Sequence, residues 1–75
     1  TILVSPVTTL SALDLSAERR DVGGDAYRIE IGGEAEVAEM LIVGDRAGVA
    51  WGADAEWTDV LPGEKPIDVA TRMLA

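Results

Sequence analysis

Apolar and polar residues alternate most regularly in the segment AYRIEI, at positions 26–31. As a strand, this segment would point its aromatic and aliphatic side chains to one face and its two charged side chains to the other. Such alternation is typical of a sheet with one solvated face. We therefore predict a strand over 26–31, followed by a turn at two glycines.

The next segment, 34–43, contains strong helix formers as well as a strand-like period, so strand and helix both fit its composition. Register favours the strand. A three-residue loop would set Ile29 opposite Val37, and the apolar faces of the two strands would match. A two-residue loop would instead set Ile29 opposite Glu36 and bury a carboxylate. We therefore predict a strand that pairs with the preceding one.

We predict that the segment EMLIVGDRAGVAWGADAEW, at positions 39–57, forms the central hairpin of the sheet. Its apolar run MLIV leads into the polar turn GDRAG, whose residues suit a turn. We expect Val43 to face Val49 across this turn. The same register would set Leu41 opposite Trp51, and these four residues would then form one buried face.

The remaining elements are less regular. The apolar run at 1–4 predicts a first strand that stops at Ser5-Pro6, because proline cannot donate to a ladder. Residues 7–21 fit a helix or a loop, and the pattern does not separate them. Alternation fails over 55–61, which predicts an edge strand or a bulge. Pro66 suits the first turn of a helix, and the apolar spacing after it predicts an amphipathic C-terminal helix.

These patterns predict an α+β fold for one small domain spanning 1–75. Its core would be a small antiparallel sheet of about four strands, with the C-terminal amphipathic helix packed on it. A domain of this size buries only about 60% of its unfolded surface. The chain contains no Cys and no His, which excludes disulfides and the commonest ligands of transition metals. We therefore expect a well-packed monomer or a chain that completes its core with a partner.

Charge is the clearest global signal. The chain has 14 acidic and 6 basic residues and a net charge of −8. Most of the excess lies between Glu30 and Asp59, where Arg46 is the one basic residue. Such a surface repels nucleic-acid phosphates and anionic lipids and attracts a basic protein surface. An acidic surface also keeps a small domain soluble, and the composition does not separate these two roles.

The sequence argues against catalysis. Without His or Cys, the Ser/His/Asp and Cys/His arrangements are excluded, and no phosphate-binding glycine motif is present. Asp54, Glu56 and Asp59 form the tightest acidic group beside an aromatic residue, but they lack the spacing and the glycine of an EF-hand. We expect no enzymatic activity, no cofactor and no metal. No segment reaches the ~18 apolar residues of a membrane span, and the lack of Cys agrees with a cytoplasmic location.

The two tryptophans make up most of the aromatic content. Trp51 is expected in the core. Trp57 lies on the strand with broken alternation, so a core position and a partly exposed contact position both remain open for it, and tryptophan is enriched at interface hot spots. The predicted partner-binding surface combines this side chain with nearby acids. Its members are Asp54, Glu56, Trp57, Asp59, Glu36 and Glu39.

The segment MLIVGDRAGVAWG combines an apolar strand, a Gly-Asp-Arg-x-Gly turn and a second strand that ends in an aromatic residue. It resembles a hairpin of small bacterial immunity proteins that neutralise polymorphic toxins. The resemblance is confined to this hairpin. It implies an acidic α+β inhibitor of a basic toxin domain, and it assigns no functional residue.

We therefore expect a non-enzymatic acidic protein-binding module. It would inhibit a basic protein, as an immunity protein, an antitoxin or a phage-encoded inhibitor. One alternative is a small structural subunit of a homo-oligomer or a virion. The other is a small metal-binding domain.

Overall fold

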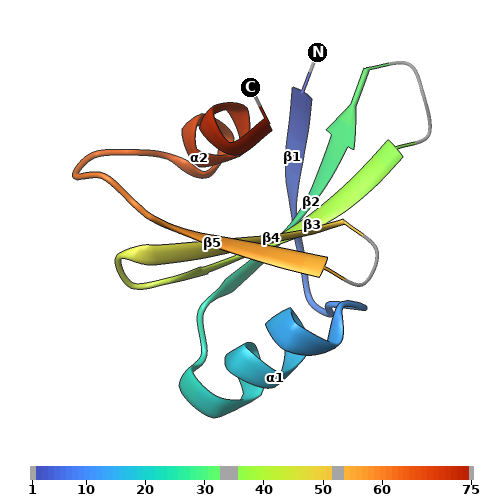
Figure 1. The fold of residues 1–75 in the computed structure, drawn as a ribbon, viewed down its shortest axis with the longest axis vertical. Coiled ribbons are helices and arrows are strands. Elements are labelled where there is room, and N and C mark those ends of the chain that lie inside the picture. The colour runs from blue at the N-terminus through green and yellow to red at the C-terminus, as the bar shows by residue number, and fades with distance from the viewer. Residues whose placement is uncertain (1, 33–35, 52–53, 75) are drawn as a thin grey trace.

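The computed structural model describes residues 2–32, 36–51 and 54–74. The described chain forms five strands and two helices (Figure 1). The elements are β1 (Ile2–Val7), α1 (Leu13–Val22), β2 (Asp25–Ile31), β3 (Glu36–Val43), β4 (Arg46–Trp51), β5 (Asp54–Asp59) and α2 (Pro66–Leu74). The strands form one antiparallel sheet in sequence order, so β1 and β5 are its edges.

This architecture confirms the predicted α+β class, with an antiparallel sheet and a C-terminal helix. The sheet has five strands rather than about four. The segment 7–21, which the sequence left open, contributes the end of β1 and most of α1. Among the described helices, none has the length and apolar character needed to cross a membrane.

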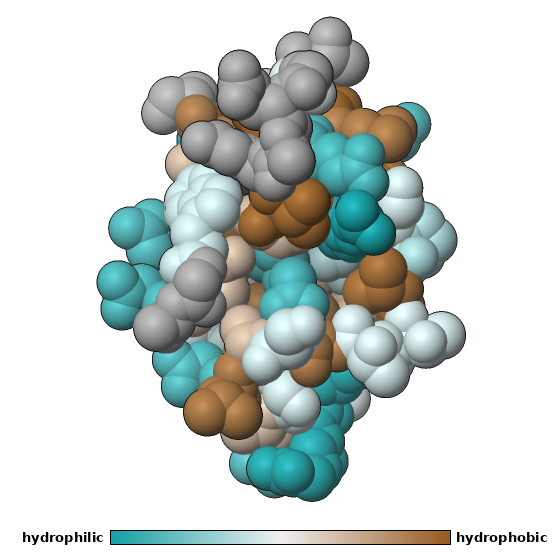
Figure 2. Space-filling model, turned by 90° about the vertical axis from the view of Figure 1, so that its right-hand side faces the viewer, coloured by the Kyte–Doolittle hydropathy of each residue, from teal (hydrophilic) through white to brown (hydrophobic). Residues whose placement is uncertain are grey.

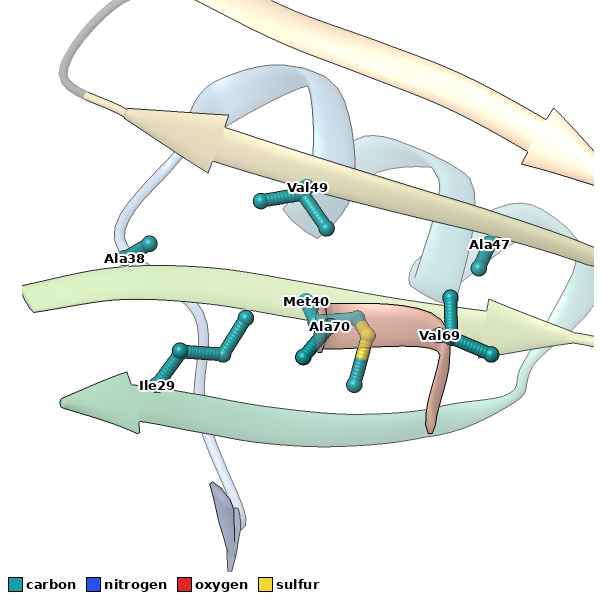
Figure 3. Close-up of a cluster of buried hydrophobic side chains, with 7 residues drawn as sticks. All are labelled: Ile29, Ala38, Met40, Ala47, Val49, Val69 and Ala70. Atoms are coloured by element: carbon teal, nitrogen blue, oxygen red, sulfur yellow. The ribbon is translucent and has the colours of Figure 1, made fainter. Parts of the chain in front are cut away.

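The two helices cover opposite faces of the sheet, here named the α1 face and the α2 face (Figure 1). The α2 face contains the main core, drawn in Figure 3, in which side chains from β2, β3 and β4 meet α2. Its buried members are Ile29, Ala38, Met40, Ala47, Val49, Val69 and Ala70. On the α1 face, Leu15 of α1 packs against Leu41 and Ala50. Burial on both faces explains why the sheet shows little alternation at its centre.

The pairing of β2 with β3 differs by one residue from the predicted register. Ile29 faces Ala38 rather than Val37, and Val37 lies opposite Glu30. A shift of one residue moves every side chain to the other face. Val37 therefore lies on the α1 face, where it is 45% exposed. The prediction failed because β3 carries apolar residues on both faces, so matching apolar faces had more than one solution.

The central hairpin is tighter than predicted. β3 and β4 are joined by a two-residue turn that begins at Gly44, whose φ of +59° favours glycine. Leu41 faces Gly48 instead of Trp51. Leu41 and Val49 are both fully buried, but in the clusters on opposite faces of the sheet. The predicted single face is therefore wrong, and Trp51, expected in the core, is 38% exposed.

Candidate interaction surface

β5 pairs with β4 along one side, and its other side is an open edge in the described part of the chain. Just beyond the strand, the N–H of Val60 donates to the carbonyl of Asp45 at 2.7 Å. Hydrogen-bonded pairs alternate with non-bonded pairs along an antiparallel ladder. The even-numbered residues of β5 therefore bond to β4. Ala55 and Trp57 direct their backbone N–H and C=O groups to the open edge.

Trp57 lies on the α1 face, opposite Gly48 of β4. A Cβ atom at Gly48 would lie 3.0 Å from Cδ2 and Cε2 of the indole and 2.8 Å from Cδ2 of Leu15. The ring therefore lies across Gly48 and beside the single buried side chain of α1. It nevertheless remains 39% exposed. Of the two positions left open for Trp57, the partly exposed one is observed, and its use in contact stays a prediction.

A cation lies over the same ring. The guanidinium carbon of Arg46 is 5.1 Å from the centroid of Trp57, within the range of a cation–π interaction. Glu18 of α1 holds this guanidinium through a contact of 2.6 Å between Nη2 and Oε1. A shallow pocket of about 320 Å³ opens beside the ring, and Thr58 and Asp59 complete its lining. The indole therefore already accommodates a guanidinium.

The predicted acids on β5 divide between the two faces of the strand. Asp59 is paired with Arg46 in the ladder and shares the α1 face with Trp57. Asp54 and Glu56 lie on the α2 face, and both are exposed. The strand edge therefore carries carboxylates on both sides of its backbone. The structure brings four of the six predicted site residues together on this one strand.

Glu39 lies on β3 and has a different role. Its carboxylate accepts the N–H of Ser11 at 3.0 and 2.8 Å and the N–H of Ala12 at 2.8 Å. Ala12 is the N-cap residue of α1, and it has no side-chain cap of its own. Glu39 therefore anchors the start of α1 to the sheet. Glu36 begins β3 opposite Ile31, and its side chain lies outside the described part of the chain.

A second anchor ties α2 to β5. Arg72 donates from Nε and Nη2 to the carboxylate of Glu64 at 2.9 and 2.8 Å, from Nη1 to Thr58 Oγ1 at 2.9 Å, and from Nη2 to the carbonyl of Asp59 at 2.5 Å. The hydrogen bond from Arg72, with a further one from the backbone N–H of Leu61, lowers the pKa of Glu64 to about 2. Arg72 therefore occupies the carbonyl of Asp59 at the end of the β5 edge. Sequence reasoning missed this cluster, because its members are too far apart in the chain to form a local motif.

A groove with a volume of about 750 Å³ lies beside the start of α1. It is lined by Pro6, Val7, Thr8, Thr9, Ser11, Ala12, Arg28, Val37, Glu39 and Ala50. Its two charged side chains already have partners. Arg28 lies 3.2 Å from Glu30, and Glu39 binds the backbone of α1.

Within the described residues, no three acidic side chains gather into a set that could hold a metal ion. Exposed apolar side chains do not merge into one large patch on the side shown in Figure 2, where brown and teal residues are interspersed. The edge of β5 is thus the part of the molecule where exposure, charge and open backbone groups coincide.

Comparison with protein-family models, with curated proteins and with solved structures finds no match to this chain.

Proposed function

We propose that the protein is a non-enzymatic binding module that docks on a basic protein through the edge of β5. The observation that carries the proposal is the half-exposed indole of Trp57 on an open strand edge, with carboxylates on both faces of that strand. Such a combination favours a partner that presents cations around an apolar contact.

The charge and the aromatic ring have separate tasks in this proposal. The net charge of −8 attracts a basic surface over a distance set by the ionic strength, and it speeds the encounter. Trp57 then supplies a large, rigid contact area close to the backbone edge. The indole lies across Gly48 and under the guanidinium of Arg46, which Glu18 holds. These contacts fix the ring before binding, which reduces the entropy lost when the complex forms.

Inhibition is the biological role that this chemistry suits best. A small acidic domain that covers the basic surface of a larger protein would block its activity, as an immunity protein, an antitoxin or a phage-encoded inhibitor does. The resemblance of the β3–β4 hairpin to immunity proteins agrees with this class, and that hairpin supports Trp57 through Gly48. A cytoplasmic location is part of the proposal, and the absence of Cys agrees with it.

Affinity capture from the source cell tests the proposal. The wild-type protein is immobilised beside Trp57→Ala and Trp51→Ala variants, and retained proteins are identified by mass spectrometry. Trp51 is the matched control, because it is the same residue type with nearly the same exposure and lies near the other end of the β4–β5 ladder. We expect a basic protein to be retained by the wild type and by Trp51→Ala, and to be lost by Trp57→Ala. Retention by all three proteins would contradict the proposal.

A structural subunit of a homo-oligomer is the second candidate, since β1 and β5 leave two sheet edges open in the described chain. β1 contains no acidic residue, whereas the carboxylates of β5 would repel a second β5. Pairing between copies would therefore join β1 to β1 or β1 to β5. Sedimentation at several micromolar concentrations distinguishes this candidate, because a strict monomer contradicts it.

A further inference from the structure

We infer that the basic partner binds as an extended segment that pairs with β5 as a sixth strand and places an arginine side chain against Trp57. This inference rests on the proposed function and specifies the form of the partner. Its three supports are the backbone groups of β5, the difference between the two sheet edges, and the pocket beside Trp57.

The backbone of β5 is available for pairing over a short and defined stretch. Ala55 and Trp57 direct their N–H and C=O groups outward, as the bond between Val60 and Asp45 fixes the phase of the ladder. The outward carbonyl of Asp59 already accepts a hydrogen bond from Arg72. Pairing is therefore confined to the stretch that ends before Asp59, and a partner segment of a few residues suffices.

The two edge strands, β1 and β5, differ in the kind of strand that they can pair with. β1 includes Pro6, which has no N–H to donate, and its sequence ILVSPV carries no charge. β5 contains no proline, and it has carboxylates on both faces. Acidic side chains on an edge strand discourage pairing with a second acidic copy. The same side chains favour a basic strand, since opposite charges across paired strands are stabilising.

The side chains of β5 define a recognition pattern for the added strand. A residue paired with Trp57 would lie on the α1 face, and its two neighbours in the chain would lie on the α2 face opposite Glu56 and Thr58. Two adjacent basic residues would therefore find the indole of Trp57 on one face and the carboxylate of Glu56 on the other. β-strand addition of this kind takes its affinity from main-chain hydrogen bonds and its specificity from alternate side chains.

The pocket beside Trp57 favours arginine at the position facing the ring. Arg46 shows that a guanidinium is accommodated over this indole, at 5.1 Å from its centroid. Glu18 offsets the charge of Arg46, and the carboxylate of Asp59 lines the same pocket. An incoming guanidinium would therefore meet an aromatic ring and a carboxylate, beside the paired guanidinium of Arg46 that lines the same pocket. Arginine suits this site better than lysine, because its planar group stacks on rings and binds carboxylates in a fork.

The test uses three capped peptides: hexa-arginine, hexa-arginine methylated at every backbone nitrogen, and hexalysine. All three carry the same charge, and the methylated peptide cannot donate main-chain hydrogen bonds. Binding is followed by the fluorescence of Trp57 in a Trp51→Phe background at ~50 mM salt, where charge attraction is weakly screened. Amide hydrogen exchange by NMR reports on the backbone of β5 in the same samples.

We expect hexa-arginine to bind, methylation to weaken it by at least about tenfold, and hexalysine to bind more weakly than hexa-arginine. Amide exchange at Ala55 and Trp57 should slow by about tenfold on binding, while the Glu56 amide, already paired with β4, should change little. Equal binding of hexa-arginine and its methylated form, without slower exchange, would overturn the strand inference and leave the acidic binding function intact. No binding of any of the three peptides at up to ~1 mM, an affinity weaker than about −4 kcal/mol, would overturn both.

Discussion

Replacement of Glu39 by alanine tests whether this carboxylate belongs to the fold or to the contact surface. In the structure it accepts three hydrogen bonds from two backbone N–H groups at the start of α1. These groups have no partner within the helix itself. The variant would therefore leave them to water and detach the beginning of α1 from β3.

The expected loss of stability follows from what α1 contributes. Removing a side-chain cap costs about 0.5–2 kcal/mol. Leu15 is the one buried residue of this helix, so the remaining packing does little to hold the helix start in place. We therefore expect a loss of about 1–2 kcal/mol, near the upper end of the range for a cap. For a domain of this size, that corresponds to a decrease of roughly 4–16 °C in Tm.

The assay is thermal unfolding followed by circular dichroism, with Glu30→Ala as the matched control. Glu30 is a glutamate on the neighbouring strand, and its contact with Arg28 is an exposed ion pair, of a kind that contributes about 0–1 kcal/mol. Glu39→Ala should lower Tm clearly more than Glu30→Ala, without weakening the capture of the basic partner after correction for unfolded protein. If Glu39→Ala and Glu30→Ala lowered Tm equally and only Glu39→Ala lost binding, the anchoring role would be refuted. Glu39 would then belong to the contact surface.

Two further variants test the packing of Trp57 and the link between α2 and β5. A Gly→Ala change ordinarily stabilises a strand by restricting the unfolded chain, but at Gly48 the new Cβ would lie 2.8 Å from Leu15 and 3.0 Å from Trp57. We therefore expect Gly48→Ala to lose about 1–2 kcal/mol of stability in urea unfolding and to shift the tryptophan emission. A variant more stable than the wild type would contradict this packing. Glu64→Gln removes a carboxylate whose pKa is lowered from 4.5 to about 2 by Arg72. The stabilising effect of the Glu64 carboxylate is complete above about pH 4.5 and declines as the pH falls towards 2. The difference in unfolding free energy between wild type and variant should therefore shrink over that interval. A constant difference from pH 7 to pH 2.5 would contradict the interaction between Glu64 and Arg72.

The sequence predicted the elements better than their pairing. The alternation in AYRIEI identified β2, and Pro66 with its following apolar spacing identified α2. The broken alternation over 55–61 left an edge strand and a bulge open, and β5 is an edge strand with an unbroken register. These signals are local, because each depends on the spacing of residues within one element.

Register failed where the prediction assumed a sheet with one apolar face. α1 covers the second face through Leu15, so β3 needs apolar side chains on both sides. The pattern of residues 7–21 fitted that helix and a loop equally, since the one buried side chain of the helix leaves almost no period. The error moved Trp51 into the predicted core and Leu41 to the wrong partner.

In the candidate site, too, the local features could be predicted and the tertiary contacts could not. The irregular strand left an exposed position open for Trp57, and the acids of β5 are visible in the sequence itself. The anchoring role of Glu39 could not be predicted, because Ser11 and Ala12 lie 27–28 residues away in the chain. The sequence could not show that Ala55 and Trp57 direct their backbone N–H and C=O groups to the open edge, because this depends on which residues of β5 hydrogen-bond to β4.

The central claim is that acidic side chains on β5 attract a basic partner. The most direct test measures the association rate of the captured partner with the wild type and with the double variant Asp54→Asn, Glu56→Gln, between ~50 and ~300 mM salt. We expect the wild-type rate to fall by about tenfold or more over this range, and the rate of the double variant to be lower at ~50 mM salt and less dependent on salt. A wild-type rate that does not change with salt, or a double variant that associates as fast as the wild type at ~50 mM, would contradict the account.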